Sequence, residues 1–291
     1  MSFNILSELI EKKNNPTVMG LDPRPEYVPE FIRSGRSLGE ALYEFNKGLI
    51  DCTADIIPAV KPQSAFYEMC GLEGLEALDK TIKYAKEAGM YVILDVKRGD
   101  IGTTAEAYAE AFFGEYSAGS DCVTVNPYLG TDSIKPFTDA CVKYDKTIFS
   151  LIKTSNPSSS DLQDVDCGGK PLYMHVADWV KKWGDATMES VGDGRYNRVG
   201  AVIGATHPAQ LGELRAVLPN TFFLVPGYGA QGGGAAETKL AFDEKGGGAI
   251  INSSRALMCA YKKGGDEKNY QKFTRDAALE MRDALNAVRF G

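Results

Sequence analysis

The sequence has no long hydrophobic run and no long basic run. None of its 291 residues lies in a stretch that approaches the ~18 apolar residues of a membrane-spanning helix. The first residues, Met1-Ser2-Phe3-Asn4, do not combine a basic segment with an apolar one, as a secretory signal would. Lysines and arginines are dispersed and the net charge is −7, which disfavours nucleic acid as a partner. We therefore expect a cytoplasmic protein that binds neither membranes nor nucleic acid.

Cysteine and histidine offer little for a disulfide framework or a metal centre. The six cysteines form no Cys-x-x-Cys pair, which favours free thiols in a reducing compartment. His175 and His207 are the only histidines, so a histidine metal site or a Ser-His-Asp triad would depend on one of two residues. His207 precedes Pro208 at a predicted helix start, and we interpret it as a packing residue.

Short apolar segments alternate with helical patterns along the whole chain. The pattern predicts eight strands: residues 17–21, 56–60, 91–96, 122–125, 148–152 and 222–225, with two more ending near residues 204 and 252. Strands that alternate with helices indicate parallel pairing through right-handed crossovers. Eight such units in 291 residues predict a (β/α)8 TIM barrel, with residues 1–291 as a single domain. No glycine-rich dinucleotide fingerprint follows the first strand, which disfavours an open doubly wound sheet.

Two local patterns predict how particular segments are built. Ser37 and Glu40 have the spacing of a capping box at the start of a helix, and so do Thr103 and Glu106. Residues 154–198 separate the fifth and sixth strands by an unusually long connection that contains a helical pattern around residues 173–183. We interpret this segment as an elaborated active-site loop of the barrel.

Charged side chains follow the first three predicted strands. Asp22, Lys61, Asp95 and Lys97 lie at strand ends, which share one mouth in a barrel and form the active site in enzymes of this fold. The alternative for Asp95 and Lys97 is an ordinary ion pair at a strand end. Glycine-rich segments flank strands seven and eight, where such barrels often hold phosphate on backbone amides, here with Arg255.

The position of Lys97 between two acids limits the reactions it can perform. Asp95 and Asp100 stabilise its ammonium form, which suits a proton donor better than a Schiff-base nucleophile. The carboxylates could instead bind Mg²⁺, which prefers oxygen ligands, but Lys61 and Lys97 would compete with the cation. We therefore expect no required metal.

A set of motifs, taken together and in this order, resembles the orotidine 5′-monophosphate decarboxylase family, in particular its longer bacterial subgroup. The resemblance covers nearly the whole chain. It rests on residues 20–23 (Gly-Leu-Asp-Pro), 60–63 (Val-Lys-Pro-Gln), 95–104 (Asp-Val-Lys-Arg-Gly-Asp-Ile-Gly-Thr-Thr), 154–157 (Thr-Ser-Asn-Pro), 226–233 (Pro-Gly-Tyr-Gly-Ala-Gln-Gly-Gly) and 254–255 (Ser-Arg). The Asp-x-Lys-x-x-Asp piece alone also resembles Mg²⁺-dependent sugar-phosphate enzymes of the same superfamily.

The resemblance implies a homodimeric, cofactor-free decarboxylase that forms uridine monophosphate in pyrimidine biosynthesis. Its charged tetrad would be Lys61, Asp95, Lys97 and Asp100, with Asp100 supplied by the partner subunit. The substrate-binding residues that it implies are Asp22 and the partner's Thr104 for the ribose, Ser155 for the pyrimidine, and Gln231 with Arg255 for the phosphate.

Two other functions stay open on the sequence alone. One is a Mg²⁺-dependent decarboxylase or aldolase acting on a sugar phosphate. The other is a non-catalytic barrel that binds a nucleotide as a sensor, although the intact set of Lys61, Asp95, Lys97 and Asp100 speaks against it.

Overall fold

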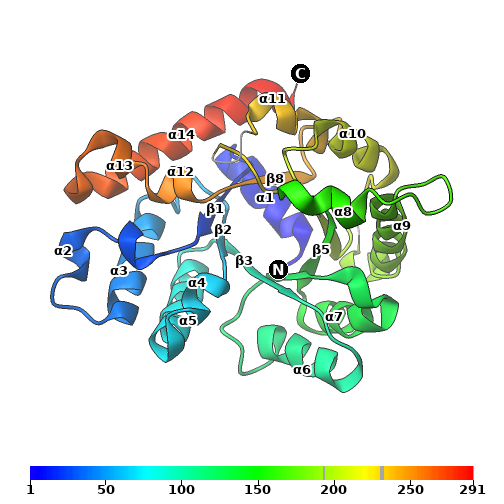
Figure 1. The fold of residues 1–291 in the computed structure, drawn as a ribbon, viewed down its shortest axis with the longest axis horizontal. Helices are drawn as coiled ribbons and strands as arrows, with labels where there is room; N and C mark the ends of the chain where they lie inside the picture. Colours follow the sequence, from blue (N-terminus) through cyan, green and yellow to red (C-terminus); the bar gives the residue numbers. More distant parts are fainter. Residues whose placement is uncertain (193, 230–232, 291) are drawn as a thin grey trace.

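Eight parallel strands close into a barrel in chain order, so the predicted (β/α)8 TIM barrel is confirmed (Figure 1). The computed structural model describes residues 1–192, 194–229 and 233–290. The strands are β1 (Thr17–Leu21), β2 (Ala59–Pro62), β3 (Tyr91–Arg98), β4 (Cys122–Val125), β5 (Thr147–Lys153), β6 (Val199–Ile203), β7 (Phe223–Val225) and β8 (Ala249–Ser253). β2 begins later than predicted because Ile56 and Ile57 continue the turn that follows the preceding helix, both amides bonding to the Thr53 carbonyl.

Helices surround the barrel and fill the connections between strands (Figure 1). They are α1 (Phe3–Lys13), α2 (Glu30–Arg33), α3 (Leu38–Asp51), α4 (Ala65–Glu68), α5 (Gly71–Glu87), α6 (Gly102–Phe113), α7 (Thr131–Tyr144), α8 (Ser160–Gln163), α9 (Leu172–Asp185), α10 (Pro208–Val217), α11 (Ala235–Thr238), α12 (Arg255–Met258), α13 (Tyr261–Gly264) and α14 (Tyr270–Arg289). None of the helices among these described residues is both long and apolar enough to cross a bilayer.

The core has two parts, because each strand buries both of its faces. One part packs the outer faces of the strands against the surrounding helices. The other fills the barrel interior and includes three residues of α1, namely Phe3, Leu6 and Ile10. Phe3 lies 4.8 Å from the Phe149 ring and 5.3 Å from the Phe222 ring, measured between centroids. The first helix therefore packs its apolar face onto the barrel interior.

One of the two predicted capping boxes is present and the other is wrong. At the start of α3, the Glu40 amide donates to Ser37 Oγ at 3.3 Å and the Ser37 amide donates to Glu40 Oε2 at 2.9 Å. At the start of α6, Ile101 is the N-cap residue and no side chain caps the helix. The chain enters α6 through Gly102 at φ +55°, so the helix has already begun at Thr103 and that side chain cannot occupy the cap.

The long connection between β5 and β6 consists of two different parts. α9 lies against β5 and β6, the ordinary place of a barrel helix, and matches the helical pattern predicted around residues 173–183. The preceding residues include α8, which lies beside the mouth of the barrel, and a green loop that extends outward past α9 (Figure 1). Leu162 and Gln163 of α8 line the cavity at the strand ends.

Candidate active site

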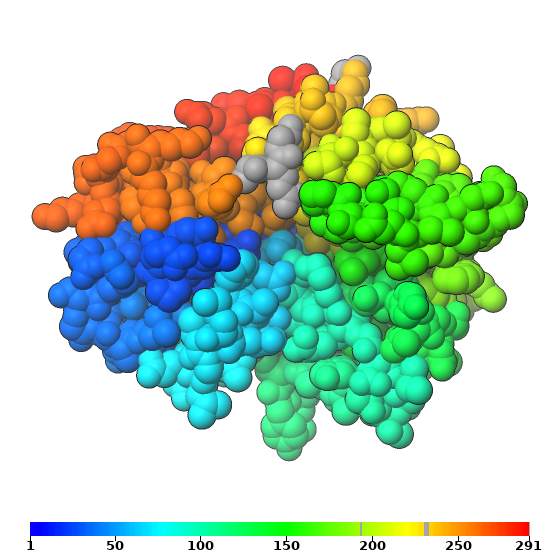
Figure 2. All heavy atoms as spheres, in the orientation of Figure 1, coloured from blue at the N-terminus to red at the C-terminus, as the bar shows by residue number. Residues whose placement is uncertain are grey.

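A cavity of about 700 Å³ opens at the carboxyl ends of the strands. Figure 2 shows the surface hollowed near its centre, between blue and cyan residues of the first third of the chain and green residues from its middle. Charged residues line one side, including Asp22, Lys61, Asp95 and Lys97. The other side is largely apolar and includes residues of α8 and α9: Leu162, Leu172, Tyr173, Val176 and Trp179.

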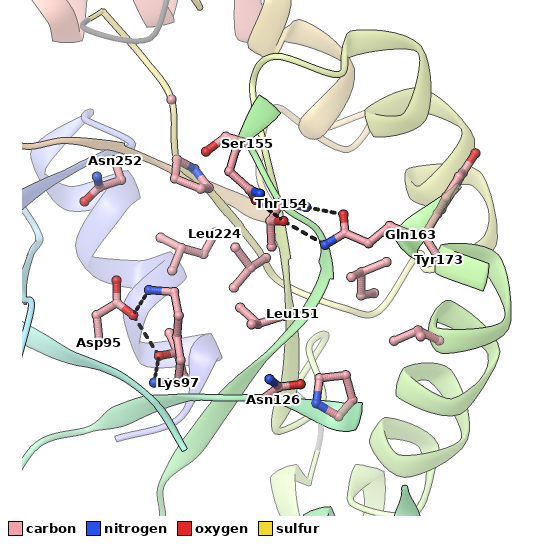
Figure 3. A pocket seen from close by; sticks show the side chains of 18 of the residues that line it. Asp95, Lys97, Asn126, Leu151, Thr154, Ser155, Gln163, Tyr173, Leu224 and Asn252 are labelled. Carbon is pink, nitrogen blue, oxygen red and sulfur yellow. Dashed lines mark hydrogen bonds and ion pairs between the residues drawn. The ribbon is translucent and has the colours of Figure 1, made fainter. Parts of the chain in front are cut away.

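Asp95 lies between the two lysines at the charged side of this cavity. Lys61 Nζ is 2.7 Å from Asp95 Oδ2. Lys97 Nζ is 2.7 Å from Asp95 Oδ1, the contact drawn in Figure 3. Asp95 and Lys61 are buried, whereas the side chain of Lys97 is 47% exposed. The ammonium group of Lys97 is therefore both fixed in position and open to the cavity.

The ionisation of this cluster follows from the balance between burial and charge. Burial alone would raise the pKa of Asp95, but Lys61 and Lys97 outweigh it and hold that pKa below its usual value. Burial would lower the pKa of Lys61, but Asp95 and Asp22 outweigh it and the pKa is raised. Lys61 and Asp95 therefore remain a charged pair, and removing Asp95 would cost about 3–5 kcal/mol because the buried ammonium of Lys61 would lose its hydrogen-bonded partner.

Lys97 has an unusual backbone conformation, which the alternation of strand residues did not predict. Its φ is +47°, and the pairing of β3 with β4 shifts register between Leu94 and Arg98. A left-handed conformation costs a residue other than glycine about 1–2 kcal/mol. Bulges of this kind redirect side chains beside active sites, and here the ammonium group of Lys97 lies 2.7 Å from Asp95 Oδ1.

Thr124 of β4 holds this bulge, and sequence reasoning missed it. Its Oγ1 accepts hydrogen bonds from the amides of Val96 at 3.0 Å and Lys97 at 2.8 Å, and donates to Asp95 Oδ1 at 2.9 Å. A threonine inside an apolar strand has no distinctive sequence signal, because its role depends on the register between β3 and β4.

Replacing Thr124 with valine is expected to lower kcat about tenfold or more and to destabilise the fold by about 1–3 kcal/mol, because the amides of Val96 and Lys97 lose their acceptor. Thr124→Ser keeps the hydroxyl and should recover most of kcat. The measurements are steady-state kinetics and thermal unfolding of both variants. An unchanged kcat in Thr124→Val would show that the bulge does not need this hydroxyl.

Asp100 and Thr104 do not line the cavity of their own chain. Asp100 lies beyond the end of β3, and its Oδ1 accepts a hydrogen bond from the Ile101 amide at 2.8 Å. Thr104 is exposed on the first turn of α6. Of the predicted tetrad, the described chain brings together Lys61, Asp95 and Lys97, and leaves Asp100 outside the cavity.

Asp22 and Asn252 present acceptor atoms that lack protein donors. Asp22 Oδ1 and Asn252 Oδ1 are both buried and have no hydrogen-bond partner among the described residues. Both residues line the cavity, Asp22 after β1 and Asn252 near the end of the adjacent β8. Buried acceptors of this kind require donors, and the hydroxyl groups of a sugar would supply them.

Two of the remaining predicted binding residues, Ser155 and Arg255, line different cavities at the mouth. Ser155 follows β5 and lines the main cavity (Figure 3). Arg255 is exposed at the start of α12 and lines a second cavity beside the first. Gln231 lies outside the described residues.

The segment that carries Ser155 is fixed by residues of the long connection, which sequence reasoning also missed. Gln163 bonds to Thr154 twice, accepting from its amide at 2.9 Å and donating to its hydroxyl at 2.7 Å (Figure 3). The adjacent Asp164 pairs with the buried Lys153 at 2.6 Å. The sequence gave no signal for these contacts, because Gln163 and Asp164 are polar residues in a loop that has no hydrophobic periodicity.

His207 completes this arrangement from the other side. As predicted, it immediately precedes Pro208 at the start of α10. Its Nε2 also lies 3.0 Å from the Thr154 carbonyl oxygen, to which it donates. The amide, hydroxyl and carbonyl of Thr154 are therefore all held by side chains from other segments.

Comparison with known proteins identifies the chain. Residues 18–270 match the family described as Orotidine 5′-phosphate decarboxylase / HUMPS. The chain belongs to the orotidine 5′-phosphate decarboxylase family. A decarboxylase of this name from Rhodopirellula baltica is 42% identical over 296 residues, covering 96% of this chain and 97% of its own. The one from Clostridium acetobutylicum is 42% identical over 289 residues, covering 98% and 99%.

A solved structure of the decarboxylase family agrees with this assignment. The Leishmania donovani OMP decarboxylase superposes with a TM-score of 0.78 at 35% sequence identity, and each chain is covered completely. The resemblance to the longer bacterial subgroup of the decarboxylase family is thus confirmed over nearly the full length.

Proposed function

We propose that this chain decarboxylates orotidine 5′-monophosphate to uridine 5′-monophosphate and CO2, with Lys97 as the proton donor and no cofactor. The reaction makes it a carboxy-lyase of pyrimidine biosynthesis. Membership of the family and relatives that match from end to end support the activity. The observation that carries the role of Lys97 is its ammonium group, held 2.7 Å from Asp95 and exposed to the cavity.

The chemistry explains why a fixed ammonium is needed. Loss of CO2 from the pyrimidine leaves a carbanion with no neighbouring carbonyl or imine to delocalise the charge, so its stabilisation must be electrostatic. Lys97 opposes the developing charge and then delivers its proton to the same carbon. Asp95 holds Lys97 in place, helped by Thr124, and Lys61 neutralises the second oxygen of Asp95.

Each of the remaining residues binds one part of the substrate: the ribose, the pyrimidine or the phosphate. Asp22 and the partner's Thr104 bind the ribose, and the unpaired Oδ1 of Asp22 supports the first of these roles. Ser155 contacts the pyrimidine. Gln231 and Arg255 bind the phosphate, a role that the exposed guanidinium of Arg255 beside the mouth supports.

A two-fold homodimer completes the site. Asp100 and Thr104 follow the β3 strand yet lie outside their own cavity, which supports the proposal that they serve the cavity of the partner subunit. The protein acts in the cytoplasm as one barrel domain of residues 1–291, and the 154–198 loop serves the pyrimidine side of its site.

The direct test is a spectrophotometric assay of orotidine 5′-monophosphate loss, with and without EDTA. We expect turnover that EDTA leaves unchanged, because both oxygens of Asp95 are already engaged by ammonium groups that would compete with a cation. Activity that EDTA abolishes and Mg²⁺ restores would favour the metal-dependent alternative. Tight binding of uridine 5′-monophosphate without turnover would favour the sensor.

A further inference from the structure

A second cavity, of about 290 Å³, opens beside the first at the ends of β1 and β8. It shares six residues with the main cavity: Asp22, Phe66, Gly227, Tyr228, Asn252 and Ser254. The second cavity is lined by none of the three charged residues Lys61, Asp95 and Lys97. A nucleotide whose base lies at the lysines and whose ribose lies at Asp22 would therefore direct its phosphate end toward this space.

The second cavity is lined by two arginines, one more than the proposed reaction assigns to the substrate phosphate. Three charged side chains line it, namely Asp22, Arg24 and Arg255. Arg255 is already assigned to the 5′-phosphate, so Arg24 is a second guanidinium for which the proposed reaction has no use.

Arg24 is held in position without being neutralised. Its guanidinium lies 5.3 Å from the Phe66 ring centroid and 6.0 Å from that of Tyr27, distances typical of cation–π contacts. Glu26 is the one carboxylate within ion-pair distance of Arg24 among the described residues, at 3.4 Å, and both side chains are exposed. An exposed pair of this kind contributes little, so most of the positive charge of Arg24 remains available to a ligand.

The loop that carries Arg24 is anchored to α13. The Tyr261 hydroxyl donates to the Tyr27 carbonyl oxygen at 2.8 Å, and Lys262 Nζ donates to that of Glu26 at 2.7 Å. In Figure 2 the blue residues of this loop and the orange residues of α13 accordingly lie side by side. Lys262 adds a further positive charge near the cavity, which therefore offers a preorganised anion site rather than a mobile arginine.

We propose that the second cavity binds the distal phosphate of a nucleoside 5′-diphosphate, with Arg24 as its specific contact. The inference rests on the proposed function, because it assumes that the base and ribose occupy the main cavity. The enzyme would then be inhibited by the diphosphate that forms when its own product is phosphorylated.

The test is calorimetric titration of uridine 5′-monophosphate and uridine 5′-diphosphate into the wild type and three variants. Arg24→Gln should weaken the diphosphate about tenfold and the monophosphate less than about twofold, as expected for one charge-assisted hydrogen bond to the second phosphate. Arg255→Gln should weaken both nucleotides. Arg33→Gln, which removes an exposed arginine paired with Glu30 on α2, is the matched control and should change neither.

The outcomes separate the inference from the function on which it rests. If Arg24→Gln weakens the binding of both nucleotides equally, Arg24 contacts the first phosphate and the inference is overturned. Unchanged affinity for both nucleotides would also overturn it. A wild type that binds the monophosphate but not the diphosphate would overturn the inference alone. A wild type that binds neither would overturn the proposed function with it.

Discussion

Replacing Lys97 with alanine is expected to lower kcat about ten-thousand-fold or more, while uridine 5′-monophosphate still binds within about tenfold of the wild type. The loss is large because one ammonium both opposes the carbanion and supplies its proton. Binding of the product survives because no such charge develops on it. Single-turnover kinetics and calorimetric binding of the product measure the two quantities separately.

The fold should survive this substitution, so the loss can be assigned to chemistry. Asp95 keeps Lys61 and the Thr124 hydroxyl as partners when Lys97 is removed. Lys97→Asn is a useful companion variant, because asparagine tolerates the left-handed backbone of this position. Near-normal turnover in both folded variants would refute the role of Lys97 as proton donor.

Mixing two inactive proteins, Lys97→Ala and Asp100→Ala, is expected to restore about a quarter of the wild-type activity after subunit exchange. With a shared site, each mixed dimer contains one doubly damaged site and one intact site. Random exchange of equal amounts makes half of the dimers mixed, and half of their sites are intact. The measurement is kcat per total subunit, with exchange verified by differently sized tags.

A matched mixture distinguishes complementation from general stabilisation. Lys97→Ala and Asp95→Asn affect residues that lie 2.7 Å apart in one chain, so their mixed dimers contain no intact site and should remain inactive. If the first mixture also remains inactive after verified exchange, Asp100 does not act across the interface. The decarboxylase assignment would be unaffected by that result.

The barrel could be predicted because its signals are local and repeated. Each strand is a short apolar run and each is followed by a helical pattern, so errors in single boundaries, as at Ile56, do not change the topology. Asp22, Lys61, Asp95 and Lys97 follow from the same logic, since polar side chains at the ends of buried strands must converge. These four residues do line the same cavity.

Features that depend on pairs of distant segments could not be predicted. The position of Thr124 against the bulge at Lys97 depends on strand register, and the contacts of Gln163 depend on where the long connection folds. The pattern at Thr103 and Glu106 failed for a related reason, because Gly102 sets the entry into α6 and the four-residue motif does not contain it.

The contacts between the long connection and β5 limit how this loop could be exchanged between related enzymes. Gln163 and Asp164 bond to Thr154, the first residue of the connection, and to Lys153, the last residue of β5. A chimera that received a foreign loop on this barrel would leave the buried Lys153 without its carboxylate. The loop and the end of β5 must therefore be exchanged together, so a successful graft must transfer residues 153 and 154 with the segment that follows them.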